Sequence, residues 1–324
     1  MVGGIRRIGR LSTLFYVGAA ILAGLGIYAV AFRSNPTAKP STVAPPAASS
    51  GPGSSQTSPA SSDVPGDSGD ASPPSDKPLQ TVPAALAPIW GSGWSLRPGG
   101  SFGTQNLQVL ESPGGGWNGP YLHVTYPAGS ASQTVTRDTG APVGGAQLYL
   151  EPEALVPASS LYLRYLVRFS PGFQFVKGGK LPGLFGGTVN NGQHIPNGTN
   201  GFSTRYMWRS GGDGEVYAYL PTSVTHGTEL GKGDWVFSTG VWHSLEQHVV
   251  LNHPDQKDGS ITVWYDGSQV YTASGLTFRT VSNLQIQGLF FSTFYGGDDP
   301  SWAPSRANSA DFADFEVAGS YISR

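Results

Sequence analysis

The chain of 324 residues has no cysteine, which excludes disulfide bonds, thiolate metal sites and a cysteine nucleophile. Charged residues make up only 12% of it, and 19 Lys and Arg against 21 Asp and Glu leave a net charge of −2. No basic stretch or basic aromatic stripe is present, which argues against a nucleic-acid partner. The 6 histidines are scattered without the spacing of metal ligands, so we expect neither a metal nor another cofactor.

An amphipathic helical pattern is also missing after residue 87. Short β-forming runs alternate there with Gly- and Pro-rich turns. This pattern predicts an all-β domain over residues 88–324, a two-sheet antiparallel sandwich or β-jelly roll with at most a turn or two of helix. The expected strands are 106–111, 120–126, 146–150, 161–169, 202–209, 215–220, 243–251, 261–266, 286–295 and 311–317.

Residues 1–33 contain a long run without charge. Three arginines in the first ten residues precede Leu11–Phe32, which is long enough to cross a bilayer as a helix. The arginines place the N-terminus in the cytoplasm and the folded domain outside it, so we expect a single-pass protein of the cell membrane. Secretion after signal cleavage is the alternative. Residues 34–87, rich in Pro, Ser and Ala, are expected to form a disordered linker.

Two expected strands and one Gly-rich run carry the candidate catalytic residues. Because side chains alternate along a strand, Ser203 and Arg205 point to the same side of one strand, and Tyr217 and Tyr219 to the same side of the other. These four residues are expected to line one polar sheet surface, which Lys180 joins from a neighbouring strand. Lys180 lies between two pairs of glycines, where the backbone allows a ligand to approach closely. Each group also has a structural interpretation: a solvated lysine, a cross-strand ion pair of the arginine, and a packed tyrosine face.

Together these groups suit the β-elimination of a uronate polymer. Removal of the proton at C5 places charge on the sugar carboxylate, which a fixed cation such as Arg205 or Lys180 stabilises. A tyrosine serves as the base only where neighbouring cations favour its phenolate form. Ser203 suits hydrogen bonding better than nucleophilic attack, and the residues alone do not decide which group is the base.

Three motifs in order closely resemble polysaccharide lyase family 14, which includes alginate and glucuronan lyases with a β-jelly-roll fold. The resemblance covers most of residues 88–324. It implies that Lys180 is the essential lysine, that Ser203 and Arg205 form the Ser-x-Arg pair, and that Tyr217 and Tyr219 form the Tyr-x-Tyr pair. The motifs are Gly179-Lys180-Leu181-Pro182-Gly183-Leu184, Phe202-Ser203-Thr204-Arg205-Tyr206-Met207-Trp208-Arg209 and Glu215-Val216-Tyr217-Ala218-Tyr219-Leu220-Pro221, with Phe291-Ser292-Thr293-Phe294-Tyr295-Gly296-Gly297 as a later match.

Substrate contacts are expected from Arg209, Tyr295 and Trp302. Trp302 follows the late Gly-Gly pair in a segment that suits a loop over the groove, where its ring would stack on a sugar. An ordinary surface loop with one packed tryptophan is the alternative. The expected partner is therefore an acidic polysaccharide, bound by a monomer.

Two other functions remain open at this point. A non-catalytic carbohydrate-binding module on a membrane stalk would keep the arginine and the aromatic residues. A glycoside hydrolase would need two carboxylates, for which Asp314 and Glu316 on one strand face are the nearest candidates. The sequence also leaves open which uronate polymer is cut, and whether within the chain or from its end.

Overall fold

The computed structural model describes residues 77–111, 116–192 and 194–322. The predicted membrane segment at 1–33 and most of the predicted linker lie outside the described residues. Within the described part of the chain, no helix combines the length and the apolar character needed to cross a bilayer.

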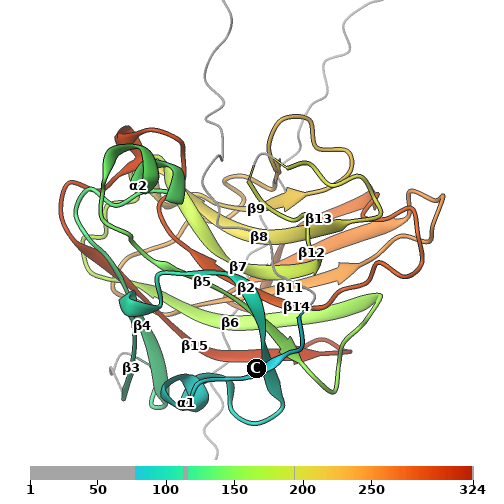
Figure 1. The fold of residues 1–324 in the computed structure, drawn as a ribbon, viewed down its shortest axis with the longest axis horizontal. Coiled ribbons are helices and arrows are strands. Elements are labelled where there is room, and N and C mark those ends of the chain that lie inside the picture. The colour runs from blue at the N-terminus through green and yellow to red at the C-terminus, as the bar shows by residue number, and fades with distance from the viewer. Residues whose placement is uncertain (1–76, 112–115, 193, 323–324) are drawn as a thin grey trace, which may run out of the picture. The chain divides into compact units, whose positions relative to one another are not determined.

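The described residues form fifteen strands in two antiparallel sheets, which confirms the predicted sandwich. Figure 1 shows how these strands are arranged. The first sheet has eight strands, in the order β1 (Gln80–Thr81), β2 (Trp94–Phe102), β5 (Ala146–Pro152), β14 (Gly288–Thr293), β7 (Gly178–Gly187), β8 (Gly201–Arg209), β9 (Gly214–Tyr219) and β10 (Thr228–Leu230). The second has seven, in the order β13 (Ser268–Leu276), β12 (Gly259–Tyr265), β11 (His243–Val250), β6 (Ser160–Phe169), β15 (Asn308–Ala318), β4 (Pro120–Tyr126) and β3 (Leu107–Glu111).

Helical structure is sparse among the described residues, as the sequence predicts. The α-helices are α1 (Ala87–Trp90) and α2 (Gln133–Thr139). Ser132 caps the second, since its hydroxyl accepts a hydrogen bond from the Val135 N–H at 3.4 Å. Short 3-10 turns lie at Ala84–Leu86, Thr104–Asn106, Ser210–Gly212 and Pro300–Trp302.

The core lies between the two sheets and is built from alternate residues of their strands. From β8, Phe202, Tyr206 and Trp208 are all 0% exposed, and from β6, Leu163 and Val167 are too. Burying one such apolar side chain contributes about 1.5–3 kcal/mol to folding. Ser203, Arg205 and Met207, which alternate with these core residues in β8, therefore point away from the core, as strand alternation predicts.

The folded region begins before residue 88, where the sequence places the end of the linker. Strand β1 pairs with β2, and Val82 and Leu86 are buried in the core. Trp90 of α1 packs edge-on against Phe291, with ring centroids 5.5 Å apart. The described residues just before 88 thus belong to the folded domain and contribute to its core.

The glycines of β7 allow this strand to lie in the middle of the first sheet. At Gly183 a Cβ would lie 2.2 Å from the carbonyl oxygen of Thr204 in β8, and at Gly179 it would lie 2.1 Å from the Trp208 ring. Only residues without a side chain permit such close approach. The Gly-rich run, which was not among the expected strands, is therefore a central strand.

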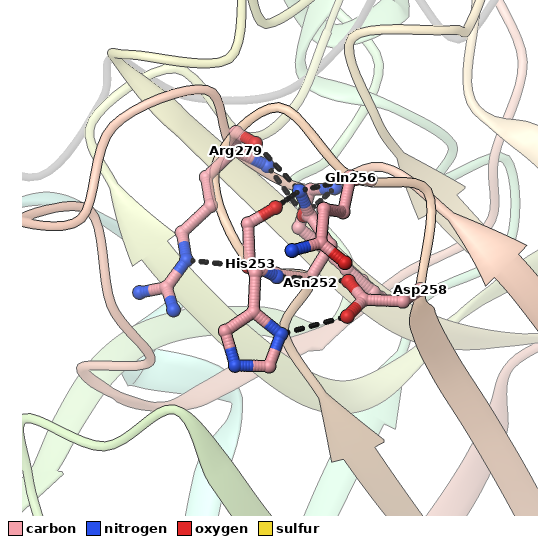
Figure 2. Close-up of polar contacts among 6 residues, drawn as sticks. Asn252, His253, Gln256, Asp258 and Arg279 are labelled. Carbon is pink, nitrogen blue, oxygen red and sulfur yellow. Dashed lines mark hydrogen bonds and ion pairs between the residues drawn. The ribbon is translucent and has the colours of Figure 1, made fainter.

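Buried Asn252 joins the loop that follows β11 to the loop that follows β13 (Figure 2). Its Oδ1 accepts hydrogen bonds from the N–H groups of Phe278 (2.7 Å) and Arg279 (3.0 Å). Its Nδ2 donates to the carbonyls of His253 (2.8 Å), Gln256 (3.0 Å) and Arg279 (2.8 Å). One side chain thus satisfies five backbone groups that the loops would otherwise leave without partners.

Candidate active site

Three consecutive strands bring the predicted catalytic residues together on the face of the first sheet that points away from the core. Strand β8 lies between β7 and β9, and all pairings are antiparallel. Arg205 stands opposite Tyr217, and Ser203 stands opposite Tyr219. Lys180 of β7 stands opposite Met207 of β8. The alternation predicted from the sequence is the one that the structure shows.

Lys180 lies over the strand next to its own. Its Nζ donates to the Met207 Sδ at 3.2 Å and lies 4.2 Å from the centre of the Tyr217 ring. Lys180 is 1% exposed and Tyr217 is 4% exposed. An ammonium held against an aromatic face in a site with little water interacts with it more strongly than it would at the surface.

Arg205 is fixed on three sides. Its Nη1 donates to the Ser292 Oγ at 3.1 Å, and the Ser292 hydroxyl donates in turn to the Gln147 Oε1 at 3.0 Å. Its guanidinium carbon lies 4.7 Å from the Phe290 ring centre and 5.8 Å from the Tyr219 ring centre. A guanidinium held in this way keeps its orientation before any ligand arrives.

The loop between β7 and β8 folds back over this face and is tied to it by hydrogen bonds. The Ser203 hydroxyl donates to the Asn190 carbonyl at 2.6 Å, and the Tyr219 hydroxyl donates to the Gly192 carbonyl. From β5, the Tyr149 hydroxyl donates to the Asn190 Oδ1 and accepts from the Asn191 Nδ2, both at 3.0 Å. The loop therefore forms one wall of the cluster around Lys180 and Arg205.

The sequence and the fold also match those of known proteins. Residues 116–315 match the family model of polysaccharide lyase 14. The chain belongs to this family. The marine PL-14 alginate lyase from Aplysia kurodai is 29% identical, with a TM-score of 0.60, over 79% of this chain and 99% of that one. The alginate lyase from Chlorella virus is 22% identical, with a TM-score of 0.59, over 70% of this chain and 93% of that one, a likeness of fold. No curated protein matches the chain.

In this family 14 chain, Arg209 lies at the edge of the cluster and is paired with two carboxylates. Its Nε donates to the Glu215 Oε1 at 2.8 Å, and its Nη2 also pairs with Glu229. Burial by itself would lower the pKa of Arg209, but the two carboxylates outweigh burial and raise that pKa. Burial also raises the pKa of Glu215, and Arg209 offsets part of this effect. The guanidinium carbon of Arg209 lies 5.5 Å from the Tyr217 ring centre. Substrate binding by Arg209 stays a prediction.

Tyr295 and Trp302, the other residues expected to contact substrate, are not brought to this cluster. Tyr295 is 1% exposed, packs edge-on against the core residue Trp208 at 5.4 Å, and donates to the Gln174 carbonyl at 2.5 Å. Trp302 is 2% exposed and belongs to the core, where a Cβ on Gly297 would lie 2.2 Å from its ring. The late Gly-Gly pair therefore makes room for the packed tryptophan.

The carboxylates considered for a hydrolase lie in the second sheet. Asp314 pairs with Arg164 of β6 at 2.7 Å, and Glu316 stands opposite the same arginine. Neither belongs to the strands that carry the cluster. Within residues 77–322 as described, no three His, Cys, Asp or Glu side chains group in a way that could hold a metal ion.

Several residues of the cluster were not among the candidates from the sequence. Met207 and Ser292 were passed over although strand alternation places them on the same face as Arg205. Tyr149 belongs to β5, whose residues Gln147, Tyr149 and Glu151 also alternate with Leu148 and Leu150 and could have been found in this way. The wall residues Asn190 and Asn191 had no such signal, because they lie in a loop without periodicity.

Proposed function

We propose that this lyase cuts an anionic uronate polymer by β-elimination, with alginate as the first candidate substrate. The observation that carries the proposal is the meeting of Lys180, Arg205 and two tyrosines on one sheet face beneath a tied loop. Membership in polysaccharide lyase 14 and the likeness to the Aplysia kurodai alginate lyase support it.

Arg205 would bind the carboxylate of the uronate at the cleaved bond. As the proton leaves C5, negative charge spreads onto that carboxylate, and a guanidinium already held by Ser292 and the rings of Phe290 and Tyr219 stabilises it without reorganising. Ground-state binding of the same carboxylate would be weaker than binding of this transition state, which is the condition for rate enhancement.

Proton transfer would fall to Lys180 and the two tyrosines. The base takes the C5 proton, the electrons of that bond form the C4–C5 double bond, and the bond from C4 to the bridging oxygen breaks. That oxygen then takes a proton from the acid, so charge and atoms balance. The Lys180 ammonium at 4.2 Å from the Tyr217 ring centre favours a phenolate there and suits Tyr217 as base, whereas neutral Lys180 acting as base is the competing assignment.

The test uses the ultraviolet absorbance of the conjugated, unsaturated uronate end that elimination leaves. The full chain is incubated with polymannuronate, polyguluronate, glucuronan and a neutral glucan. We expect absorbance to rise with at least one uronate polymer, to be lost in Lys180→Ala, and to persist in Lys177→Ala, since Lys177 is an exposed neighbour that bonds Ser301 at 2.6 Å. Binding without absorbance would instead support a binding module, and new reducing ends without absorbance would support hydrolysis.

We further propose that the enzyme acts outside the cytoplasm, held by residues 1–33. The support is the uncharged run Leu11–Phe32 behind three arginines. Fractionation of cells and protease treatment of intact cells test it. A chain that stays with the membrane and is digested from outside is expected; a chain in the medium that lacks its first residues would support the secreted alternative.

A further inference from the structure

The outer face of the second sheet, on the other side of the sandwich from the catalytic cluster, carries a row of polar residues on three neighbouring strands. Asp311 of β15 stands opposite His123 of β4 on one side and Arg168 of β6 on the other. Their sequence neighbours Leu122 and Phe312 belong to the core, so the row points outward.

A hollow of about 310 Å³ opens at this row, lined among others by Tyr121, His123, Arg168, Ser170 and Asp311. Its volume lies at the lower end of the range of about 300–1,000 Å³ for small-molecule sites. It shares no lining residue with the cluster around Lys180.

Aromatic rings hold the guanidinium of Arg168 in place at this hollow. Its carbon lies 5.0 Å from the Trp242 ring centre and 5.9 Å from the Tyr121 ring centre, and the two rings meet edge-to-face at 6.3 Å. The side chain of Arg168 is 18% exposed. An arginine fixed by rings and by a carboxylate loses little further side-chain entropy when it binds a ligand.

The hydrogen-bonding groups that remain for a ligand belong to Arg168 and His123, because both oxygens of Asp311 are already engaged. Asp311 uses Oδ2 for the Nε (3.0 Å) and Nη2 (2.8 Å) of Arg168, and Oδ1 for the Nδ1 of His123 at 2.7 Å. Among the described residues, neither the Arg168 Nη1 nor the His123 Nε2 makes a hydrogen bond. The one carboxylate is thus engaged by two partners, while an N–H fork and a ring nitrogen stay available.

The geometry points to a second, non-catalytic site at this hollow, which binds a uronate unit through Arg168 and His123. Arg168 would offer its remaining N–H groups to the carboxylate, and the His123 Nε2 would add a second polar contact to the same sugar. Such a site would hold a neighbouring stretch of polymer while the other sheet cuts it. Only the choice of a uronate as ligand rests on the function proposed above.

A calorimetric titration with a saturated uronate trisaccharide tests this site on the full chain carrying Lys180→Ala, which prevents cleavage. We expect two bound molecules per chain. Adding Arg168→Lys, which keeps the charge but removes the fork, should leave one, or weaken the second site at least about tenfold, the loss of roughly one charge-assisted hydrogen bond.

Arg164→Lys is the matched control, because Arg164 lies on the same strand and face and pairs with Asp314 at 2.7 Å in the same way. It should leave two bound molecules. If thermal unfolding shows that Arg168→Lys does not fold, His123→Gln takes its place with the same expectation, since glutamine can still donate to Asp311.

One bound molecule in all of these variants would overturn the second site. A neutral gluco-oligosaccharide that fills it equally well, with or without Arg168→Lys, would overturn the assignment to uronates. This test and the absorbance test can fail independently. Two binding sites in a chain that produces no absorbance would contradict the lyase proposal alone. Absorbance from a chain with a single binding site would contradict the second site alone.

Discussion

The ammonium of Lys180 in β7 lies 4.2 Å from the centre of the Tyr217 ring in β9, so the lysine reaches over the intervening strand β8. Met207 of β8 fills the space beneath, with its sulfur 3.2 Å from the Nζ. A cation, a phenol and a thioether are thereby packed together. The hydroxyl of Tyr217 can be removed by mutation while the ring that contacts the ammonium stays in place.

Tyr217→Phe keeps the ring that Lys180 rests on and removes only the hydroxyl. We expect kcat on the uronate polymer to fall by about 100-fold or more, as for loss of a general acid or base, with a small change in KM. Absorbance kinetics measure both. Tyr162→Phe, on the outer face of the second sheet, is the control, and an unchanged kcat in Tyr217→Phe would exclude that hydroxyl from proton transfer.

Arg205→Lys keeps a positive charge but loses the planar fork and its stacking. We expect kcat/KM to fall by about 100- to 1,000-fold, comparable to loss of an oxyanion-stabilising donor. Ser292→Ala should cost less, about tenfold, because it removes one hydrogen bond that orients the guanidinium. Equal losses of kcat/KM in Arg205→Lys and Ser292→Ala would show that the orientation of the guanidinium matters as much as the guanidinium itself.

Tyr149→Phe tests how the loop wall is held. The change removes a hydroxyl that bonds Asn190 and Asn191 at 3.0 Å each, so we expect a loss of about 1–3 kcal/mol in the free energy of unfolding. Denaturant unfolding measures it, and limited proteolysis should show faster cutting between residues 188 and 200. The same change at the half-buried Tyr271 is the control; a loop that stays resistant would mean that Ser203 and Tyr219 hold it alone.

Asn252→Ala removes the side chain that joins the loops of Figure 2. Five hydrogen bonds to backbone groups disappear from a buried site, and we expect about 3 kcal/mol or more of lost unfolding free energy. Asn106→Ala, which removes donors to the carbonyls of Val143 and Gly145, should cost less. Similar losses in the two variants would argue against a special role for Asn252.

His248 should make the fold sensitive to acid. Its ring stacks on Tyr162 with centroids 3.8 Å apart, and burial lowers the pKa of His248 below its usual value of about 6.5. The unfolded chain takes up this proton at a higher pH than the folded one, so stability is full above about pH 6.5 and falls as the pH drops toward the folded pKa. Thermal unfolding between about pH 7.5 and 4.5 should show a smaller decline in His248→Asn than in the unmodified chain or in His194→Asn, whose ring is exposed.

The sequence predicted the sandwich and the faces of β8 and β9 because period-two alternation is a local property of a strand. It did not predict β7, since the glycines that permit close packing there also resemble a turn. Trp302 shows the same limit: a Gly-Gly pair before a tryptophan suits a flexible loop, yet here a glycine makes room for a buried ring. Asn190 and Asn191 depend on contacts with β5, more than 35 residues away, which no local pattern encodes.

The strands β7, β8 and β9 are consecutive along the chain, and the stretch from Gly178 to Tyr219 carries all five predicted catalytic residues. The five candidate groups are therefore close together in the sequence as well as in space. The side chains that orient them are not, because Ser292 and Phe290 belong to β14 and Tyr149 belongs to β5. Grafting Gly178–Tyr219 alone onto another sandwich would therefore transfer the candidate groups without the side chains that hold Arg205 and the loop wall in place.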